Sequence, residues 1–348
     1  MEPRLFFDAH CDTALKVLDD GADFAEGSSS THLDFPRFRE AGVRAQLFAC
    51  FVLSERYPRR EVERVEELFD CVETMVAATD GELRIVRTGS ELRAAFEGGP
   101  AAAILGLEGA DPLQGRAANL RRFHQRGVRS LIFAWKDNPF SGTAFGRNDP
   151  LTAEGERLLG LSEELGVMVD VSHLSDAAFE NVCRASTRPF IASHSNCRTL
   201  CPSGRNLTDR MMRSLADRGG VMGINLSTSF LSPSTLDAWK RIRERFEGSK
   251  LDWREREQVA KGLAPTVARP PFEWITRHVL HAINVGGEDA VGLGGDLDGI
   301  LHLPEGVEGV QDYPKIPEAL RAAGVSEGQI EKICHRNFLR VFGEVLSD

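Results

Sequence analysis

The sequence predicts an α/β fold, a single (β/α)8 barrel of the TIM type that spans residues 1–348. Short apolar runs recur about eight times along the chain, and each is followed by a helical pattern. The runs are apolar throughout instead of alternating with polar residues, which is typical of parallel strands covered by helices on the outside. A doubly wound open sheet is the alternative, but no Gly-x-Gly-x-x-Gly follows the first strand to support it.

The expected strands and helices follow from local patterns. The strands occupy residues 6–12, 43–52, 101–107, 128–135, 167–173, 189–194, 221–226 and 290–295, with a shorter candidate at 83–86. A long helix is expected at 59–76, because apolar residues from Val62 to Val76 recur every three or four positions. Thr152 caps the start of another helix and Gly166 ends it. Further helices are expected at 90–96, 120–126, 176–184, 208–218, 272–285, 316–323 and 326–346.

The alternation of strands and helices breaks at residues 230–270, before the last strand. This charged stretch has helical spacing at Leu236, Trp239 and Ile242, and two prolines close it. We expect a helical insertion that serves as a lid, as a dimer surface or as decoration of the barrel. The last two are favoured, so a homodimer is one expected state.

Composition and charge limit the function classes. The chain has 42 Lys and Arg against 52 Asp and Glu, a net charge of −10, and no basic run, which argues against nucleic-acid binding. No apolar stretch approaches the roughly 18–20 residues of a membrane span, and no signal-peptide pattern precedes the first strand. The seven cysteines show no Cys-x-x-Cys pair. We therefore expect free thiols, a cytoplasmic location and no membrane partner.

Ionisable residues stand at the carboxyl ends of the expected strands. His10 and Asp12 end the first strand, where alternation places residues two apart on one face. Four more stand at the ends of later strands: Glu108, His173, His194 and Asp296. In a barrel all these ends meet at one mouth, where active sites are built. Three imidazoles and three carboxylates gathered there indicate a divalent-metal site, because neighbouring carboxylates repel one another unless cations neutralise them.

The metal interpretation depends on this recurrence, since a single histidine at a strand end is more often a hydrogen-bonded structural residue. The other histidines lie in expected helices or loops and are interpreted as structural: His32, His124, His278, His281, His302 and His335. Cys11 is expected on the strand face opposite His10 and is not counted as a ligand. Imidazole and carboxylate ligands without thiolate suit two Zn²⁺ ions, with Mn²⁺ or Co²⁺ as substitutes.

Six motifs, in order, resemble those of the membrane (renal) dipeptidase family. They are Asp8–Asp12, Leu107–Gly109, Val169–His173, Ser193–Ser195, Arg205–Asn206 and Gly294–Gly299. The resemblance runs from Leu5 to about Phe342, apart from the insertion at 230–270. The family consists of zinc metallopeptidases with an amidohydrolase-type barrel. The resemblance implies that His10 and Asp12 bind one zinc ion, that His173 and His194 bind a second, and that Glu108 bridges the two.

The resemblance also implies a reaction, the hydrolysis of a dipeptide by a metal-activated water. Asp296 would be the general acid and base. Arg205 would bind the substrate carboxylate as a two-pronged fork, a geometry that lysine lacks. Asp8, on the expected strand face of His10, is a candidate partner of that ligand, and a structural role is the alternative.

One position departs from the family's pattern. Many members carry a substrate-contacting histidine after the strand equivalent to residues 128–134, whereas here Trp135 stands at that place. Its indole N–H donates one hydrogen bond but carries no charge, so Trp135 is a substrate-contacting candidate with a different preference. Another amidohydrolase-type activity, on lactones, cyclic amides or N-acyl amino acids, is therefore an alternative. A non-enzymatic binding module would require lost ligands, and the six strand-end residues are all chemically competent.

Overall fold

Eight parallel strands close into a ring in the computed structural model, which describes residues 4–246, 251 and 253–348. The ring consists of β1 (Phe6–Cys11), β2 (Val43–Phe51), β4 (Ala101–Glu108), β5 (Val128–Ile132), β6 (Met168–Asp170), β7 (Ile191–Ser195), β8 (Val221–Ile224) and β9 (Val291–Leu293). Neighbours follow the order β2-β1-β9-β8-β7-β6-β5-β4, and β4 pairs back with β2. The predicted (β/α)8 barrel is confirmed, and the open sheet is excluded because the ring closes.

A ninth strand lies outside the ring. β3 (Leu83–Ile85) pairs only with Ala101–Ala103 of β4. Both β2 and β3 pair with Ala102, so they lie on opposite edges of β4. The shorter candidate at 83–86 is therefore a strand that extends the sheet without joining the barrel.

Most helices match the predicted ranges. They are α3 (Glu61–Ala77), α4 (Gly89–Phe96), α5 (Leu120–Arg126), α6 (Ala153–Leu165), α7 (Asp176–Ala185), α8 (Asp209–Asp217), α12 (Glu273–Gly286), α13 (Lys315–Ala322), α14 (Glu327–Glu331) and α15 (Asn337–Val345). The Thr152 side chain accepts the N–H of Gly155, and Gly166 has a left-handed conformation, as expected for the two ends of α6. A π-helical turn, η5 (Lys332–Arg336), interrupts the predicted helix at 326–346.

Two helices were not predicted, α1 (Thr13–Asp20) and α2 (Phe35–Ala41). α1 has eight residues and α2 has seven. The start of α2 nevertheless carries a recognisable signal, since Asp34 accepts the N–H of Arg37 and a proline follows in the first turn.

Apolar side chains from six of the eight ring strands fill the interior of the ring. Phe7, Leu47, Ile104, Met168, Ile191 and Val221 form this cluster together with Phe338 and Phe342 of α15. The ring of Phe7 lies 5.5 Å from that of Phe338 and 5.3 Å from that of Phe342. Four of these strand residues lie first or second in their strands, so α15 closes the amino end of the barrel. Polar side chains are left for the carboxyl end.

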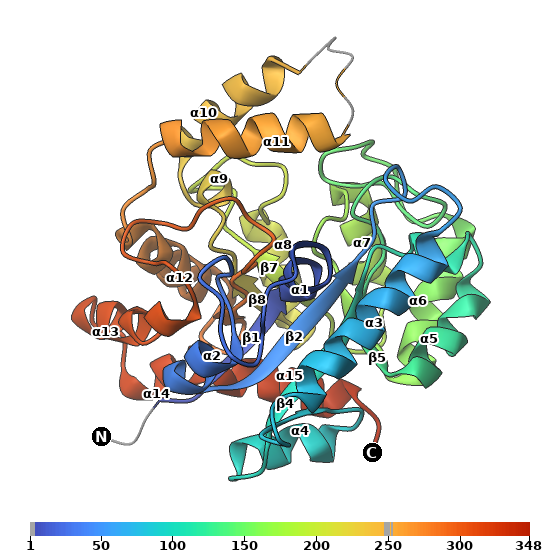
Figure 1. Ribbon diagram of the computed structural model, residues 1–348, viewed down its shortest axis with the longest axis horizontal. Coiled ribbons are helices and arrows are strands. Elements are labelled where there is room, and N and C mark those ends of the chain that lie inside the picture. The colour runs from blue at the N-terminus through green and yellow to red at the C-terminus, as the bar shows by residue number, and fades with distance from the viewer. Residues whose placement is uncertain (1–3, 247–250, 252) are drawn as a thin grey trace.

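The predicted insertion at 230–270 is helical where it is described. It contains α9 (Thr228–Leu231), α10 (Pro233–Glu244), α11 (Trp253–Leu263) and the short turn η3 (Ala264–Thr266), while 247–250 and 252 lie outside the described residues. Trp239, Ile242, Ala264 and Val267 form a small apolar cluster of their own. In Figure 1, α10 and α11 lie at the top, at the end of the barrel toward which β2 runs.

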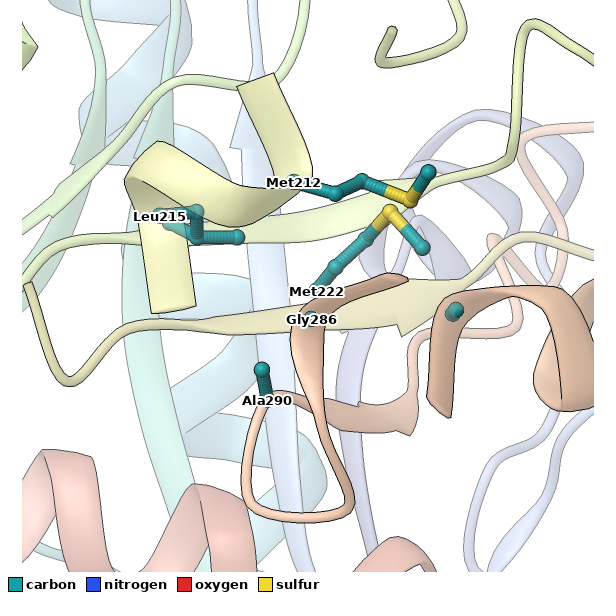
Figure 2. Close-up of a pocket in the computed structure, with 6 residues that line it drawn as sticks. Met212, Leu215, Met222, Gly286 and Ala290 are labelled. Carbon is teal, nitrogen blue, oxygen red and sulfur yellow. The ribbon is translucent and has the colours of Figure 1, made fainter. Parts of the chain in front are cut away.

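Packing around the barrel leaves a small apolar gap between α8, β8 and α12 (Figure 2). It is lined by Met212, Leu215, Met222, Ala282, Gly286 and Ala290. With a volume of about 10 Å³ and no ionisable lining, it has room for one water at most. Among the described residues, no helix combines the length and the apolar character that crossing a membrane requires.

Candidate metal centre

A bulge in β1 turns His10 toward the barrel interior. Asp8 pairs with Gln46 of β2 and Cys11 pairs with Phe48, so β1 has one extra residue between these pairings. Ala9 packs in the interior cluster, whereas Cys11 packs in the outer one. The alternation therefore reverses at the bulge, and His10 lies with its Nε2 3.6 Å from Oδ2 of Asp12.

Asp8 does not share the side of His10, so that expectation is wrong. Its Oδ2 accepts the O–H of Tyr313 at 2.7 Å, and its Oδ1 accepts the N–H of Gly295 at 2.8 Å. Phe6 packs edge-on against the same Tyr313 ring, with the centroids 5.9 Å apart. Asp8 thus links β1 to the segment after β9, which is the structural role named above as the alternative to a partner of His10.

Glu108, the last residue of β4, lies between two imidazoles. Its Oε2 is 3.4 Å from Nε2 of His10, and its Oε1 is 3.2 Å from Nε2 of His173. Burial alone would raise the pKa of Glu108, but the two histidines hold it well below its ordinary value. Each oxygen faces a different imidazole, which suits a carboxylate shared by two cations.

His173 and His194 face one another, with their Nε2 atoms 3.0 Å apart. His173 follows β6 in a left-handed backbone conformation (φ 70°), a strain that is typical of functional sites. His194 lies in β7, which pairs with β8 at Ala192 and next at Ser195 across a second bulge. Burial, with the positive charge of Arg205, lowers the pKa of His173 to about 4. Burial and His10 likewise lower the pKa of His194, so both rings are neutral at pH 7, as metal ligands must be.

These side chains form overlapping groups whose ligand atoms lie within 4.8 Å of one another. One group is His10, Asp12 and Glu108, and another is Glu108, His173 and His194. Nε2 of His10 is buried without a hydrogen-bond partner, a costly state for a polar atom unless a ligand occupies it. The residues therefore fit a divalent metal, and their imidazole and carboxylate donors suit zinc, manganese or cobalt. The identity and the number of the ions stay predictions.

Asp296 lies beside this cluster but belongs to none of its groups among the described residues. It is buried three residues beyond β9 with a φ of 57°, and Nδ2 of Asn225 donates to its Oδ2 at 2.9 Å. Burial raises the pKa of Asp296 to about 6, with Glu108 acting in the same direction. A Cβ at Gly299 would overlap the carboxylates of Asp12 and Asp296, so glycine lets the loop after β9 approach them.

Arg205 lies behind His194 and is buried. Its Nη1 donates to Ser195 Oγ at 2.7 Å and its Nη2 donates to the carbonyl oxygen of His194 at 2.8 Å. Its Nε has no hydrogen-bond partner. Burial lowers the pKa of Arg205 to about 10, which still leaves the guanidinium charged at pH 7. Phe230 of α9 packs beside the guanidinium, 5.9 Å from its carbon to the ring centroid.

Trp135 is half-buried at the edge of the same cluster. Its ring lies 6.0 Å from that of His173 and 4.9 Å from that of Phe51. An indole therefore stands next to a candidate metal ligand, and its contact with substrate stays a prediction. None of the six histidines interpreted as structural belongs to a metal-binding group in the described parts of the chain.

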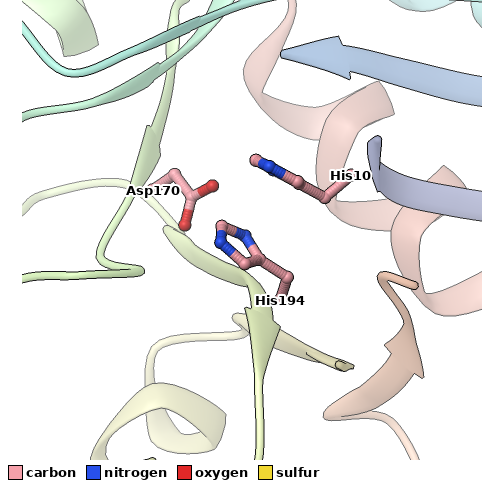
Figure 3. A group of neighbouring side chains, drawn as sticks. All are labelled: His10, Asp170 and His194. Atoms are coloured by element: carbon pink, nitrogen blue, oxygen red, sulfur yellow. The ribbon is translucent and has the colours of Figure 1, made fainter. Parts of the chain in front are cut away.

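Two polar residues near the centre were missed by the sequence reasoning. Asp170, the last residue of β6, forms a third group with His10 and His194 (Figure 3). Asp170 lies inside the strand expected at 167–173, whereas the candidate ligands were expected at the carboxyl ends of strands. A carboxylate inside an apolar run is itself a signal. Asn225 follows β8 and carries no charge, so its contact with Asp296 had no local signal.

The sequence profile of the membrane dipeptidase family, peptidase family M19, matches residues 1–347. The chain belongs to this family. It is therefore a metallodipeptidase, a hydrolase, and the recognition of the family from its motifs is confirmed.

Individual relatives are similar over nearly their whole length. A protein encoded in the pqqA 5′ region of Klebsiella pneumoniae is 31% identical over 279 residues, 78% of this chain and 92% of the relative. The solved structure of dipeptidase AC, a family M19 metallopeptidase, has a TM-score of 0.84 at 29% identity and covers 100% of both chains. A Rhodobacter sphaeroides metallopeptidase, solved with a phosphinate mimic of L-Ala-D-Ala, has a TM-score of 0.83 at 29% identity and covers 99% of this chain and 100% of that one.

Proposed function

We propose that the chain acts as one hydrolase unit that cleaves dipeptides with two Zn²⁺ ions, for which Mn²⁺ or Co²⁺ can substitute. His10 and Asp12 would hold one ion, His173 and His194 the other, and Glu108 would bridge them. The main support for this proposal is that the two carboxylate oxygens of Glu108 face different imidazoles, those of His10 at 3.4 Å and His173 at 3.2 Å. When bound, the metal ions would supply a water of lowered pKa and polarise the scissile carbonyl.

Asp296 takes the proton from the attacking water and delivers it to the leaving amine. Its raised pKa, about 6, suits a group that gains and loses a proton near neutral pH. Asn225 holds one carboxylate oxygen, so the other is available for the transfer. The neighbouring Glu108 keeps a pKa well below its ordinary value and stays ionised as a ligand.

Arg205 binds the free carboxylate of the substrate and so limits its length. Two of the five guanidinium N–H groups donate within the protein, and Nε has no partner there. The remaining N–H groups are available to a carboxylate, and the interaction is strong where water is excluded. The phosphinate mimic of L-Ala-D-Ala bound by the Rhodobacter sphaeroides relative supports a dipeptide as the substrate.

A panel of L–L and L–D dipeptides, assayed with metal analysis of the same preparation, tests this function. Lactones, cyclic amides and N-acyl amino acids belong in the panel, because Trp135 stands next to His173 where many family members carry a histidine. Turnover of dipeptides well above these compounds supports the proposal, whereas faster turnover of lactones or acyl amino acids contradicts it. The seven cysteines are free, which leads us to propose a reducing compartment such as the cytoplasm.

A further inference from the structure

Asp170 is a buried carboxylate that the proposed mechanism does not use. Its Oδ1 accepts the backbone N–H groups of Ser172 at 2.9 Å and of Ser193 at 3.0 Å. Its Oδ2 is buried and has no hydrogen-bond partner. A buried carboxylate oxygen without a partner needs a hydrogen-bond donor or a cation, because burial of an unsatisfied charged group is costly.

The carboxylate of Asp170 lies beside two of the candidate metal ligands. A carboxylate oxygen of Asp170, a nitrogen of His10 and a nitrogen of His194 lie within 4.8 Å of one another. Figure 3 shows the carboxylate beside both rings, which come from β1 and β7 while Asp170 comes from β6. The two rings lie against each other, with centroids 3.7 Å apart and planes inclined by 31°.

The two rings use opposite nitrogens for different neighbours. Nε2 of His10 faces Glu108, and Nε2 of His194 faces His173. On the other side, Ser193 Oγ lies 2.7 Å from Nδ1 of His194 but 3.5 Å from Nδ1 of His10. A good hydrogen bond of this kind is about 2.7–3.2 Å long. Ser193 Oγ is therefore the hydrogen-bond partner of His194 Nδ1, and it is too far from Nδ1 of His10 to be a good acceptor for that nitrogen.

Metal coordination makes an acceptor for Nδ1 of His10 necessary. A neutral imidazole that binds metal through Nε2 carries its proton on Nδ1, and that N–H needs an acceptor. A third cation between Asp170 and the two rings is the competing interpretation. It would occupy the second nitrogen of both imidazoles, which would then have to become imidazolates.

We propose that Asp170 is a positioning residue for the metal ligands His10 and His194, resting on the metal site of the proposed function. With metal bound, its free oxygen would accept the Nδ1–H of His10, and its negative charge would favour the tautomer that leaves Nε2 of both rings available to metal. Ligand-orienting carboxylates of this kind change metal affinity by about 10–100-fold.

The test is the Zn²⁺ affinity of the apoprotein, measured by competition with a chromophoric chelator. Asp170→Asn keeps the size of the side chain and an oxygen for the two backbone N–H groups, but replaces Oδ2 by an NH₂ donor. We expect it to bind Zn²⁺ about 10–100-fold more weakly than the wild type. Asp34→Asn is the matched control, since Asp34 is equally buried but caps α2, and its Zn²⁺ affinity should equal that of the wild type.

Imidazole ¹⁵N NMR of the Zn²⁺-loaded wild type shows which ring nitrogens carry protons. A purely structural role of Asp170 would not determine these positions. Protons on Nδ1 of His10 and His194 support the proposal, whereas metal bound through Nδ1 of His10 overturns it. This measurement decides the matter even if Asp170→Asn does not fold. Unchanged affinity in Asp170→Asn overturns this inference alone. A wild type that binds no Zn²⁺ overturns the proposed function as well.

Discussion

Replacing Asp296 by asparagine should separate proton transfer from metal binding. The amide has nearly the same shape, and its oxygen can still accept from Asn225, which donates to Asp296 at 2.9 Å. It cannot take a proton from the attacking water. Because Asp296 belongs to none of the three metal-binding groups of the described residues, the metal content should stay at the wild-type value.

The magnitude follows from the role. Positioned general acids and bases contribute about 10²–10⁴-fold to rate. At 1.36 kcal/mol per factor of ten, this is about 2.7–5.4 kcal/mol of transition-state stabilisation. We therefore expect kcat for a dipeptide to fall by about 10²–10⁴-fold in Asp296→Asn, with a smaller change in KM.

The assay is steady-state hydrolysis of one dipeptide together with metal analysis of the same protein. Asp298→Asn is the matched control, since Asp298 is also buried with a positive φ but binds the Thr13 hydroxyl and the His32 N–H. It should lower kcat by less than about tenfold. Wild-type turnover in metal-loaded Asp296→Asn would refute the role of Asp296. Loss of metal in this variant would instead make Asp296 a ligand.

Three further outcomes are expected. Arg205→Ala should raise KM for dipeptides with a free carboxylate much more than for their amides. Equal effects on both in steady-state assays would show that Arg205 does not bind the substrate carboxylate. Trp135→His should change the ranking of substrates in a dipeptide panel without changing metal content; an unchanged ranking would show that Trp135 does not contact substrate. The unfolding midpoint of the apoprotein should fall as pH rises from about 6.5 to about 8. Burial and Glu108 raise the pKa of Asp12 to about 7. Burial alone would lower the pKa of His10, but Glu108 and Asp12 outweigh it and raise this pKa, so the folded state holds protons that the unfolded chain releases. Burial lowers the pKa values of His173 and His194, so these two act in the opposite direction, and their effect fades as pH rises above about 6.5, the ordinary pKa of histidine. A thermal midpoint that rises between these pH values would contradict the assignment.

The barrel and the meeting of its polar strand ends could be predicted because both follow from local patterns. The apolar run at 101–107 is a strand that ends in Glu108, and the helix expected at 120–126 is α5. Once eight such units close into a ring, their carboxyl ends share one mouth. This is why His10 and His194, 184 positions apart in the sequence, lie against each other.

The finer geometry could not be predicted because it depends on pairing between distant strands. The extra residue in β1 exists only relative to β2, and the one in β7 only relative to β8. Each bulge reverses the alternation of side chains, so simple alternation placed Asp8 on the side of His10 when it binds Tyr313 instead. Asn225 was missed for a similar reason, since its partner Asp296 follows another strand. Asp170 did carry a local signal, a carboxylate inside an apolar run, although its neighbours His10 and His194 come from other strands.

Titration of Zn²⁺ into the apoprotein, with dipeptide turnover followed at each addition, tests the two-metal site most directly. If Glu108 bridges ions held by His10 and Asp12 on one side and by His173 and His194 on the other, turnover should saturate at two equivalents per chain. Full turnover without metal, or saturation at one equivalent, would contradict the site described here.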